Sequence, residues 1–232
     1  MDNCLECREL SKRFGAVQAL DSVNISIAPG RVVGLLGPNG SGKTTLIKLA
    51  NGLLTPTGGE ITVCGLQPGK QSKALVSYLP DKTCLPEWMS AEQLMDYYAD
   101  FYQDFDRERA QEMMARLGLQ LEMKVGQMSK GTREKVQLIL VMSRRARLYL
   151  LDEPIGGVDP ATRDYILDTI IRNYDESASV VISTHLISDV ENVLDDVIFI
   201  REGKITMQAS VDDIRAQYGK SVDALFREVF KC

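Results

Sequence analysis

Long apolar runs are missing from this sequence. A membrane-spanning helix needs about 18 consecutive apolar residues, and the longest candidates, such as Val136–Met142, are far shorter. The N-terminus, Met-Asp-Asn-Cys-Leu-Glu-Cys, also lacks the basic segment and apolar core of a secretory signal. We therefore expect a protein of the cytosol, alone or held at a membrane by a partner.

Long basic runs are missing as well. The net charge is −5, which argues against nucleic acid as the main ligand. The remaining composition, 44% hydrophobic and 25% charged over 232 residues, is ordinary for a soluble globular chain. This length predicts one large domain or two small ones.

A disulfide framework is not indicated either, because the cysteines are scattered and odd in number. They are Cys4, Cys7, Cys64, Cys84 and Cys232. Cys4 and Cys7 have the spacing of zinc ligands, but there is no second such pair and only one histidine in the sequence. We expect reduced cysteines, with the first two on an early strand.

Residues 37–44 carry the most specific pattern in the chain, Gly-Pro-Asn-Gly-Ser-Gly-Lys-Thr. The pattern G-x-x-x-x-G-K-[ST] is typical of a phosphate-binding loop, in which backbone N–H groups surround an anion. Lys43 would reach the β- and γ-phosphates, and the Thr44 hydroxyl would ligate Mg²⁺. An ordinary Gly-rich turn is the alternative. It is disfavoured because an apolar β-type run, Val32–Leu36, precedes the loop and a helical pattern follows it.

The remaining chain alternates between strand-like and helical segments. Strands are predicted at 3–11, 22–28, 60–64, 74–79, 148–151 and 180–183, a closing hairpin at 197–200 and 204–208, and helices at 106–117, 131–142 and 162–174. This order predicts an α/β fold with a mostly parallel sheet, an N-terminal antiparallel β portion and an inserted helical subdomain. We expect a single domain, 1–232. Its core would be 1–85 with 146–209, its helical subdomain 86–145 and its C-terminal helical extension 210–232.

Two apolar stripes leave alternatives open. Ser90 and Gln93 have capping-box spacing, and an aromatic stripe follows them between Leu94 and Phe105. Such a stripe is more often the core of a helical subdomain than a partner surface. The stripe Leu225, Phe226, Val229 and Phe230 near the C-terminus would fold back onto the core or contact another subunit, and we favour the first.

Acidic residues and a histidine follow two of the predicted central strands. Asp152 and Glu153 end the run Leu148–Leu151, and His185 follows Val180–Thr184. Ligands of parallel sheets lie beyond the carboxyl ends of the strands. We therefore expect Asp152 to hold Mg²⁺ and Glu153 to orient or deprotonate an attacking water. His185 would hydrogen-bond the γ-phosphate, although a structural role is equally compatible with its position.

With these motifs in order, the chain resembles the nucleotide-binding subunit of an ATP-binding cassette (ABC) transporter, a family with a P-loop NTPase core. The resemblance covers nearly the whole length. It implies ATP and Mg²⁺ as cofactors, Asp152 as the magnesium aspartate, Glu153 as the catalytic glutamate and His185 as the switch histidine. It further implies nucleotide contacts for Phe14, Asn39, Gly40, Ser41, Gly42, Lys43, Thr44, Thr45, Ser129, Gly131 and Asp159. Phe14 would stack on adenine, and its alternative is simple core packing.

Two stretches depart from the family pattern. The signature Leu-Ser-Gly-Gly-Gln is replaced by Met128-Ser-Lys-Gly-Thr132, which keeps Ser129 and Gly131 for the γ-phosphate. Lys130 would add positive charge near ATP or would face solvent. Asp81 stands where the family has a Gln that touches Mg²⁺. An Asp can still ligate the metal, but it brings negative charge near a triphosphate.

The resemblance also implies partners. ATP would lie between two subunits arranged head to tail, a second copy of this chain or a homologous ATPase. A separate membrane permease would dock near Asp81 and the helix after Trp88, at the cytoplasmic face of a bacterial cell membrane. The overall run is closer to drug or peptide exporter subunits than to importer subunits. Alternatives are an importer ATPase, an ABC-type ATPase that acts on nucleic acid or ribosomes, and a phosphate-loop kinase; no nucleic acid partner is expected.

Overall fold

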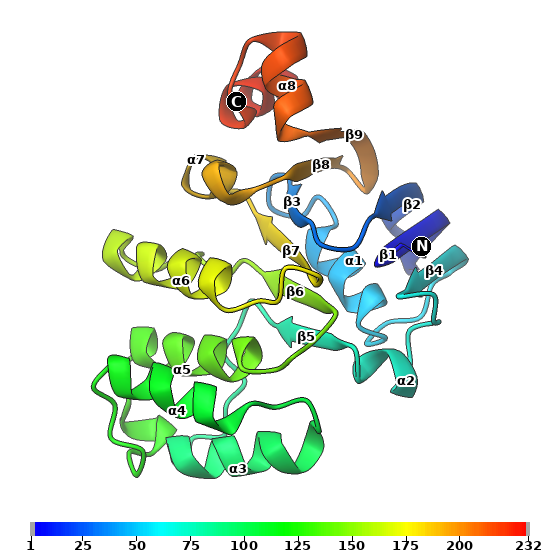
Figure 1. Cartoon of the computed structure of the whole chain (residues 1–232). Coiled ribbons are helices and arrows are strands. Elements are labelled where there is room, and N and C mark those ends of the chain that lie inside the picture. The colour runs from blue at the N-terminus through cyan, green and yellow to red at the C-terminus, as the bar shows by residue number, and fades with distance from the viewer. Residues whose placement is uncertain (1–2, 231–232) are drawn as a thin grey trace.

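Two β-sheets and a helical lobe make up the computed structural model, which describes residues 3–230 (Figure 1). The strands are β1 (Leu5–Phe14), β2 (Val17–Ile27), β3 (Val32–Leu36), β4 (Gly58–Val63), β5 (Val76–Leu79), β6 (Leu148–Asp152), β7 (Ser179–Thr184), β8 (Asp196–Arg201) and β9 (Lys204–Ser210). The α-helices are α1 (Lys43–Ala50), α2 (Lys70–Lys73), α3 (Ala91–Phe101), α4 (Arg107–Arg116), α5 (Lys130–Met142), α6 (Pro160–Arg172), α7 (Ile187–Val190), α8 (Val211–Tyr218) and α9 (Val222–Phe230). Two short 3₁₀ turns lie at Val125–Gln127 and Glu191–Val193.

The larger sheet has the order β5-β6-β7-β3-β8-β9. Its first five strands are parallel, and β9 pairs antiparallel with β8 as the predicted closing hairpin. Strands β3, β6 and β7 are buried along their whole lengths. Continuous apolar runs are typical of parallel strands that are covered on both faces. The carboxyl ends of β3, β6 and β7 therefore meet at one edge, which carries the functional side chains.

The smaller sheet has the antiparallel order β2-β1-β4. Helix α1 packs between the two sheets, since its buried residues share one apolar cluster with strands of both. This arrangement confirms the predicted antiparallel N-terminal portion. The predicted limits 3–11 and 22–28 were too short, however, because β1 and β2 extend into a hairpin that turns at Gly15. The alternating half-exposed residues at that end gave a weak strand signal.

Helices α5 to α9 cover the other face of the larger sheet and form its second apolar cluster. Near the C-terminus, Phe226 and Phe230 stack on each other and lie edge-on to Phe199 of β8. The C-terminal stripe therefore folds back onto the core, as we favoured. Cys232, the last of the five cysteines, lies outside the described residues.

Helices α3, α4 and one side of α5 form a separate lobe with its own apolar cluster, at the bottom of Figure 1. The predicted capping box starts α3, because Ser90 Oγ accepts from Gln93 N and Gln93 Oε1 accepts from Ser90 N. The aromatic residues of the stripe on α3 differ in exposure. Tyr98 is half-buried in the lobe, whereas Tyr97 and Phe101 are exposed with their ring centroids 4.6 Å apart. The expectation that the stripe is mainly core was therefore wrong for its outer half.

Candidate active site

The phosphate-loop pattern occupies the turn between β3 and α1. Gly40 and Gly42 have φ angles of 78° and 113°, a region that favours glycine. A Cβ on Gly42 would lie 2.7 Å from the carbonyl oxygen of Ala19, so a side chain there would be both strained and crowded. Helix α1 begins at Lys43, directly after this turn. The local sequence therefore folds as the strand, loop and helix N-terminus that suit an anion.

Lys43 is buried at the first turn of α1. Its Nζ donates to the carbonyl oxygens of Gly37 (2.8 Å) and Pro38 (3.2 Å). The same atom lies 3.2 Å from Glu153 Oε1, at ion-pair distance. Because these partners belong to the loop and the end of β6, Lys43 joins the two motifs into one site.

Asp152 is the last residue of β6 and is only 1% exposed. Its Oδ1 accepts from Ser183 Oγ (2.6 Å) and Thr44 Oγ1 (3.1 Å). Burial raises the pKa of Asp152, and the nearby Asp81 and Glu153 charges act in the same direction, against the two hydroxyl hydrogen bonds. Its Oδ2 is buried and has no hydrogen-bond partner among the described residues. A cation at this oxygen would satisfy it and favour the ionised carboxylate.

Glu153 follows directly and turns away from the strand with a φ of 50°. Its N–H is held by Ser183, through the carbonyl oxygen (3.0 Å) and the hydroxyl (3.1 Å). Its Oε2 lies 3.1 Å from His185 Nδ1. Its Oε1 is buried, and no donor within residues 3–230 bonds it in good geometry. A non-glycine residue in this conformation is uncommon and is held by its neighbours, as is frequent at functional sites.

These side chains surround an open pocket of about 550 Å³. It is lined by Val17, Gln18, Ala19, Asn39, Gly40, Ser41, Gly42, Lys43, Thr44, Thr45, Asp81, Glu153, Gly156, Gly157 and His185. The structure thus brings together the phosphate loop, Asp81, Glu153 and His185, which are far apart in sequence. Pockets of this size suit a nucleotide-sized ligand.

Five candidate residues are not among the lining residues, and one of them, Asp152, accepts a hydrogen bond from the lining residue Thr44. Phe14 is 46% exposed at the β1–β2 turn, with Lys12 Nζ 5.1 Å from its ring centroid, so simple core packing is excluded. Ser129 caps α5 and accepts from Thr132 N (3.2 Å), and Gly131 follows it. Asp159 caps α6, where hydrogen bonds from Thr162 lower the pKa of its carboxyl. Within one described chain, Ser129, Gly131 and Asp159 do not line the pocket.

Ser183 was missed from the sequence, although it holds both acidic residues. It lies opposite Asp152 in the β6–β7 register. Its signal was a hydroxyl at the end of an otherwise apolar buried strand, which we took as part of that strand. Val17, Gln18, Ala19 and Gly156 were also missed as lining residues, and their sequence positions gave no pattern of their own. Gly157, which also lines the pocket, precedes Asp159 in the stretch that resembles the family's loop between subunits.

The side chains at the pocket suit a Mg²⁺ ion that is held partly by waters and substrate phosphates, and not an ion held by protein ligands alone. Among residues 3–230, no group of three or more His, Cys, Asp or Glu side chains is arranged to hold a metal ion. Mg²⁺ usually keeps waters and binds one or two carboxylates together with substrate phosphates. Thr44 and Asp81 supply a hydroxyl and a carboxylate of this kind at the pocket, and the buried carboxylate of Asp152 accepts from the Thr44 hydroxyl.

None of the helices found between residues 3 and 230 is both long and apolar enough to cross a bilayer.

Comparisons with known proteins agree with this geometry. A family model described as "ABC transporter" matches residues 20–156, which is more than half of the chain. The "ABC transporter ATP-binding protein YtrB" of Bacillus subtilis is 31% identical over 93% of this chain and 75% of its own length. The "SkfA peptide export ATP-binding protein SkfE" of the same organism is 31% identical over 97% of both chains.

Solved structures show the same fold. One described as "Structure of ATP binding subunit of ABC transporter" has a TM-score of 0.88 at 28% identity, covering 98% of this chain and 99% of its own. A dimeric cassette bound to ADP and Pi, MJ0796, has a TM-score of 0.77 at 21% identity, covering 89% and 98%. The chain therefore belongs to the ABC transporter family, as an ATP-binding subunit with ATPase activity.

Proposed function

We propose that this chain powers a separate membrane permease through ATP-driven pairing with a second copy of itself or a homologous ATPase. The observation that carries the proposal is the division of the nucleotide-binding residues. Residues 39–45 line the pocket together with Glu153, whereas Ser129 and Gly131 lie at an exposed helix start elsewhere. In a head-to-tail pair, Ser129 and Gly131 of one subunit would complete the pocket of the other.

On the loop side, the backbone from Asn39 to Gly42, with Thr45, would hold the phosphates. Lys43 would leave the carbonyl oxygens of Gly37 and Pro38 for the β- and γ-phosphates. This exchange is favourable because phosphate oxygens carry more charge than carbonyls. Phe14 is exposed beside the pocket residue Val17 and is available for adenine stacking. Asp159 would act as the acidic member of a loop between subunits while it also caps α6.

For hydrolysis, Glu153 would orient a water and take its proton through its buried Oε1, which lies 3.2 Å from Lys43 Nζ and would be released when Lys43 moves to the phosphates. His185 fixes the other carboxylate oxygen and would also reach the γ-phosphate. Mg²⁺, held by Thr44, Asp152 and Asp81, would neutralise the negative charge of the phosphates. Asp152 would then be ionised, since a bound cation offsets the effect of its burial.

The surface for the permease would lie on the helical lobe. Trp88 and Phe101 are 69% and 67% exposed, and Tyr97 packs against Phe101. Aromatic residues are enriched at protein interfaces. The segment that follows Asp81 links this surface to the pocket, and its Cys84 N–H donates to buried Gln137 Oε1 of α5 (2.9 Å). Movement of the lobe would thereby reach Asp81.

We place this subunit at the cytoplasmic face of a bacterial membrane and favour export. Support for export comes from a relative named for peptide export, and another relative is named as a probable multidrug ABC transporter ATP-binding protein. One alternative is an importer ATPase. The other is an ABC-type ATPase acting on nucleic acid or ribosomes, and the net charge of −5 disfavours this second one. We also keep the division into core (1–85 and 146–209), helical subdomain (86–145) and extension (210–232) as a proposal.

The test is the Glu153→Gln variant with Mg-ATP. We expect ATP binding to remain, turnover to fall about 10²–10⁴-fold because the general base is lost, and a dimer to accumulate on size-exclusion chromatography. Adding Ser129→Asp to the same chain should return it to monomers, because the second half of the site is then broken. A Glu153→Gln chain that stays monomeric in Mg-ATP would contradict the proposal.

A further inference from the structure

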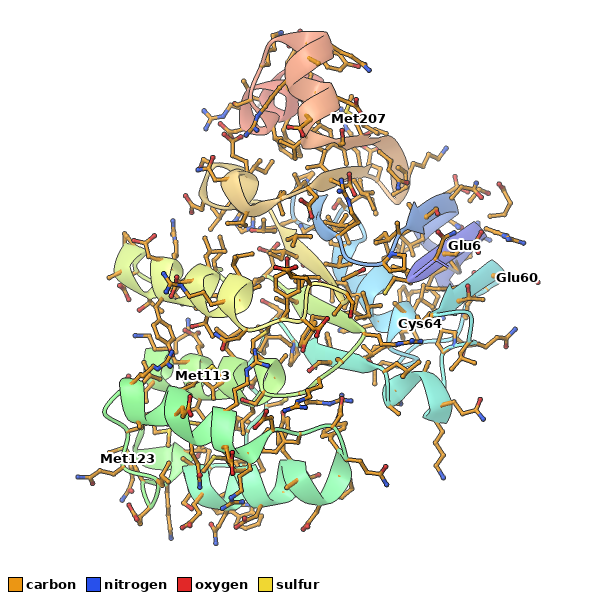
Figure 2. All side chains as sticks on the ribbon, viewed as in Figure 1. Glu6, Glu60, Cys64, Met113, Met123 and Met207 are labelled. Carbon is orange, nitrogen blue, oxygen red and sulfur yellow. The ribbon has the colours of Figure 1, made fainter. Side chains whose placement is uncertain are left out.

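Two thiols that the nucleotide site does not use lie side by side in the smaller sheet. Cys4 Sγ and Cys64 Sγ are 3.8 Å apart, although the residues are 60 positions apart in sequence. Cys4 precedes β1 and Cys64 follows β4, and Cys64 N donates to the carbonyl oxygen of Cys4 (2.9 Å). Figure 2 shows Cys64 at the inner side of the small sheet, with Glu60 nearer its outer edge.

The backbone geometry suits a covalent link. The β1–β4 ladder pairs Leu5 with Val63, and Cys4 and Cys64 are the next residues beyond that pair, where Cys64 has a φ of 49° and its N–H donates to Cys4 O. Residues opposite each other in such a ladder have Cα atoms about 4.5–5.5 Å apart. Disulfides accept Cα separations of about 4.4–6.8 Å. The two sulfurs would therefore bond after rotation of side chains, without movement of the strands.

The two thiols differ in environment. A hydrogen bond from Cys4 lowers the pKa of Cys64 to about 7, with help from the positive charge of Arg147 and against partial burial. The same contact and burial raise the pKa of Cys4 far above its ordinary range. Cys64 is partly accessible, whereas Cys4 is buried and lies 3.4 Å from the carbonyl oxygen of Arg147. A reactive thiolate thus lies against a protonated, sheltered thiol.

We propose that Cys4 and Cys64 form a reversible intramolecular disulfide when the protein meets a peroxide. The Cys64 thiolate attacks one oxygen of hydrogen peroxide; the O–O bond breaks, and Cys64 becomes a sulfenic acid as hydroxide leaves. Cys4 sulfur then attacks the sulfenic sulfur. The S–O bond breaks, and the departing hydroxide takes the Cys4 proton and leaves as water. Two thiols are oxidised, one peroxide is reduced, and a dithiol reverses the reaction.

The pair is separate from the nucleotide pocket. Cys4 contacts Arg147, which precedes β6, whereas Asp152 ends that strand. The thiols and the catalytic acids therefore lie at opposite ends of β6, and the disulfide site stands whether or not the chain drives a permease.

The test uses the full chain, hydrogen peroxide, alkylation of the remaining thiols and a tryptic peptide map. Trypsin places Cys4 and Cys7 together in residues 1–8, Cys64 in 49–70 and Cys84 in 83–107. We expect peptide 1–8 linked to 49–70 in the wild type, in the buried control Cys7→Ala and in the exposed control Cys84→Ser. We expect the link to be absent in Cys4→Ala, where dimedone should capture the sulfenic acid of Cys64.

Alkylation rates give a second readout. At pH 7, Cys64 should react about tenfold faster than Cys84, because only the thiolate is nucleophilic. In Cys4→Ala the midpoint of the rate against pH should move upward from about 7, since the hydrogen bond is lost. A link that joins Cys7, Cys84 or Cys232, or a Cys64 no faster than Cys84, would overturn the proposal.

Discussion

The two halves of the proposed nucleotide site differ in how completely one chain organises them. The loop half, residues 37–44 with Asp152 and Glu153, has its Lys43 and Asp152 side chains buried and is joined by hydrogen bonds across three strand ends. The signature half, Ser129–Arg133, lies at an exposed helix start and bonds mainly to its own turn. Preorganised groups act on a ligand without first having to rearrange. The exposed helix start of the signature half would contact a nucleotide only when the pocket of another subunit brings it there. The fold of one chain therefore arranges the residues that would bind ATP, while pairing of two chains would complete the site for ATP hydrolysis.

Breaking the loop half should have the largest effect. Lys43→Met removes the cation that contacts Gly37, Pro38 and Glu153, and we expect ATP turnover to fall about 10³-fold or more. ATP binding to the isolated chain should weaken in parallel, as measured by calorimetry. Lys48→Met on the same helix is the matched control, because Lys48 does not line the pocket within the described chain. Equal losses in both variants would mean that helix α1, not the ammonium group, is responsible.

Breaking the signature half should separate pairing from binding. Ser129→Asp keeps a good N-cap, so the free energy of unfolding should change by less than about 0.5 kcal/mol. The added negative charge would oppose a γ-phosphate. We expect turnover to fall about 100-fold and ATP-dependent dimers to disappear, while ATP binding to the monomer stays unchanged. Normal turnover in this variant would remove Ser129 from the site.

The same contrast explains what the sequence could and could not predict. The loop half was found because its glycines, Lys43 and Thr44 are contiguous and its acids end an apolar strand. Ser183 was missed because its role depends on which strands are neighbours, and β6 and β7 pair across 30 intervening positions. The half-buried α3 stripe was assigned to the core because helical period does not tell which neighbour covers each side. Helix α2 was also missed, since four polar residues give no period.

The buried Asp152 of the loop half lowers the stability of the folded chain at neutral pH. This effect is smaller than the two above, and it depends on pH. Because the pKa of Asp152 is raised in the folded chain, its proton is held more tightly there than in the unfolded chain. Stability is full below the ordinary Asp pKa of about 4 and falls as pH rises from there through the raised pKa. At pH 7 we expect Asp152→Asn to be more stable than the wild type by about 1 kcal/mol in urea unfolding without nucleotide.

Asp159→Asn is the control with opposite sign. Hydrogen bonds from Thr162 lower the pKa of Asp159, so its contribution is present above the ordinary Asp pKa and is lost as pH falls through the lowered one. The two variants should therefore change the pH profile of unfolding in opposite directions. If both variants change the pH profile in the same direction, burial is not what sets the pKa of Asp152.

The smallest expected effect lies where the two halves would meet, at Asp81. Asp81 lines the pocket and adds to the negative charge near Asp152, so metal must offset two carboxylates before a triphosphate binds. We expect Asp81→Gln to shift the Mg²⁺ concentration for half-maximal ATP turnover by about 2–10-fold, because each kcal/mol of lost charge interaction changes affinity about fivefold. The maximal rate at saturating Mg²⁺ should change less, since Glu153 and His185 remain in place.

Asp100→Asn on the exposed side of α3 is the matched change of charge away from the pocket and should leave the Mg²⁺ titration unchanged. An unchanged titration in Asp81→Gln would place its carboxylate outside the metal site. The segment from Asp81 to Cys84 would then act through its hydrogen bond to Gln137 alone.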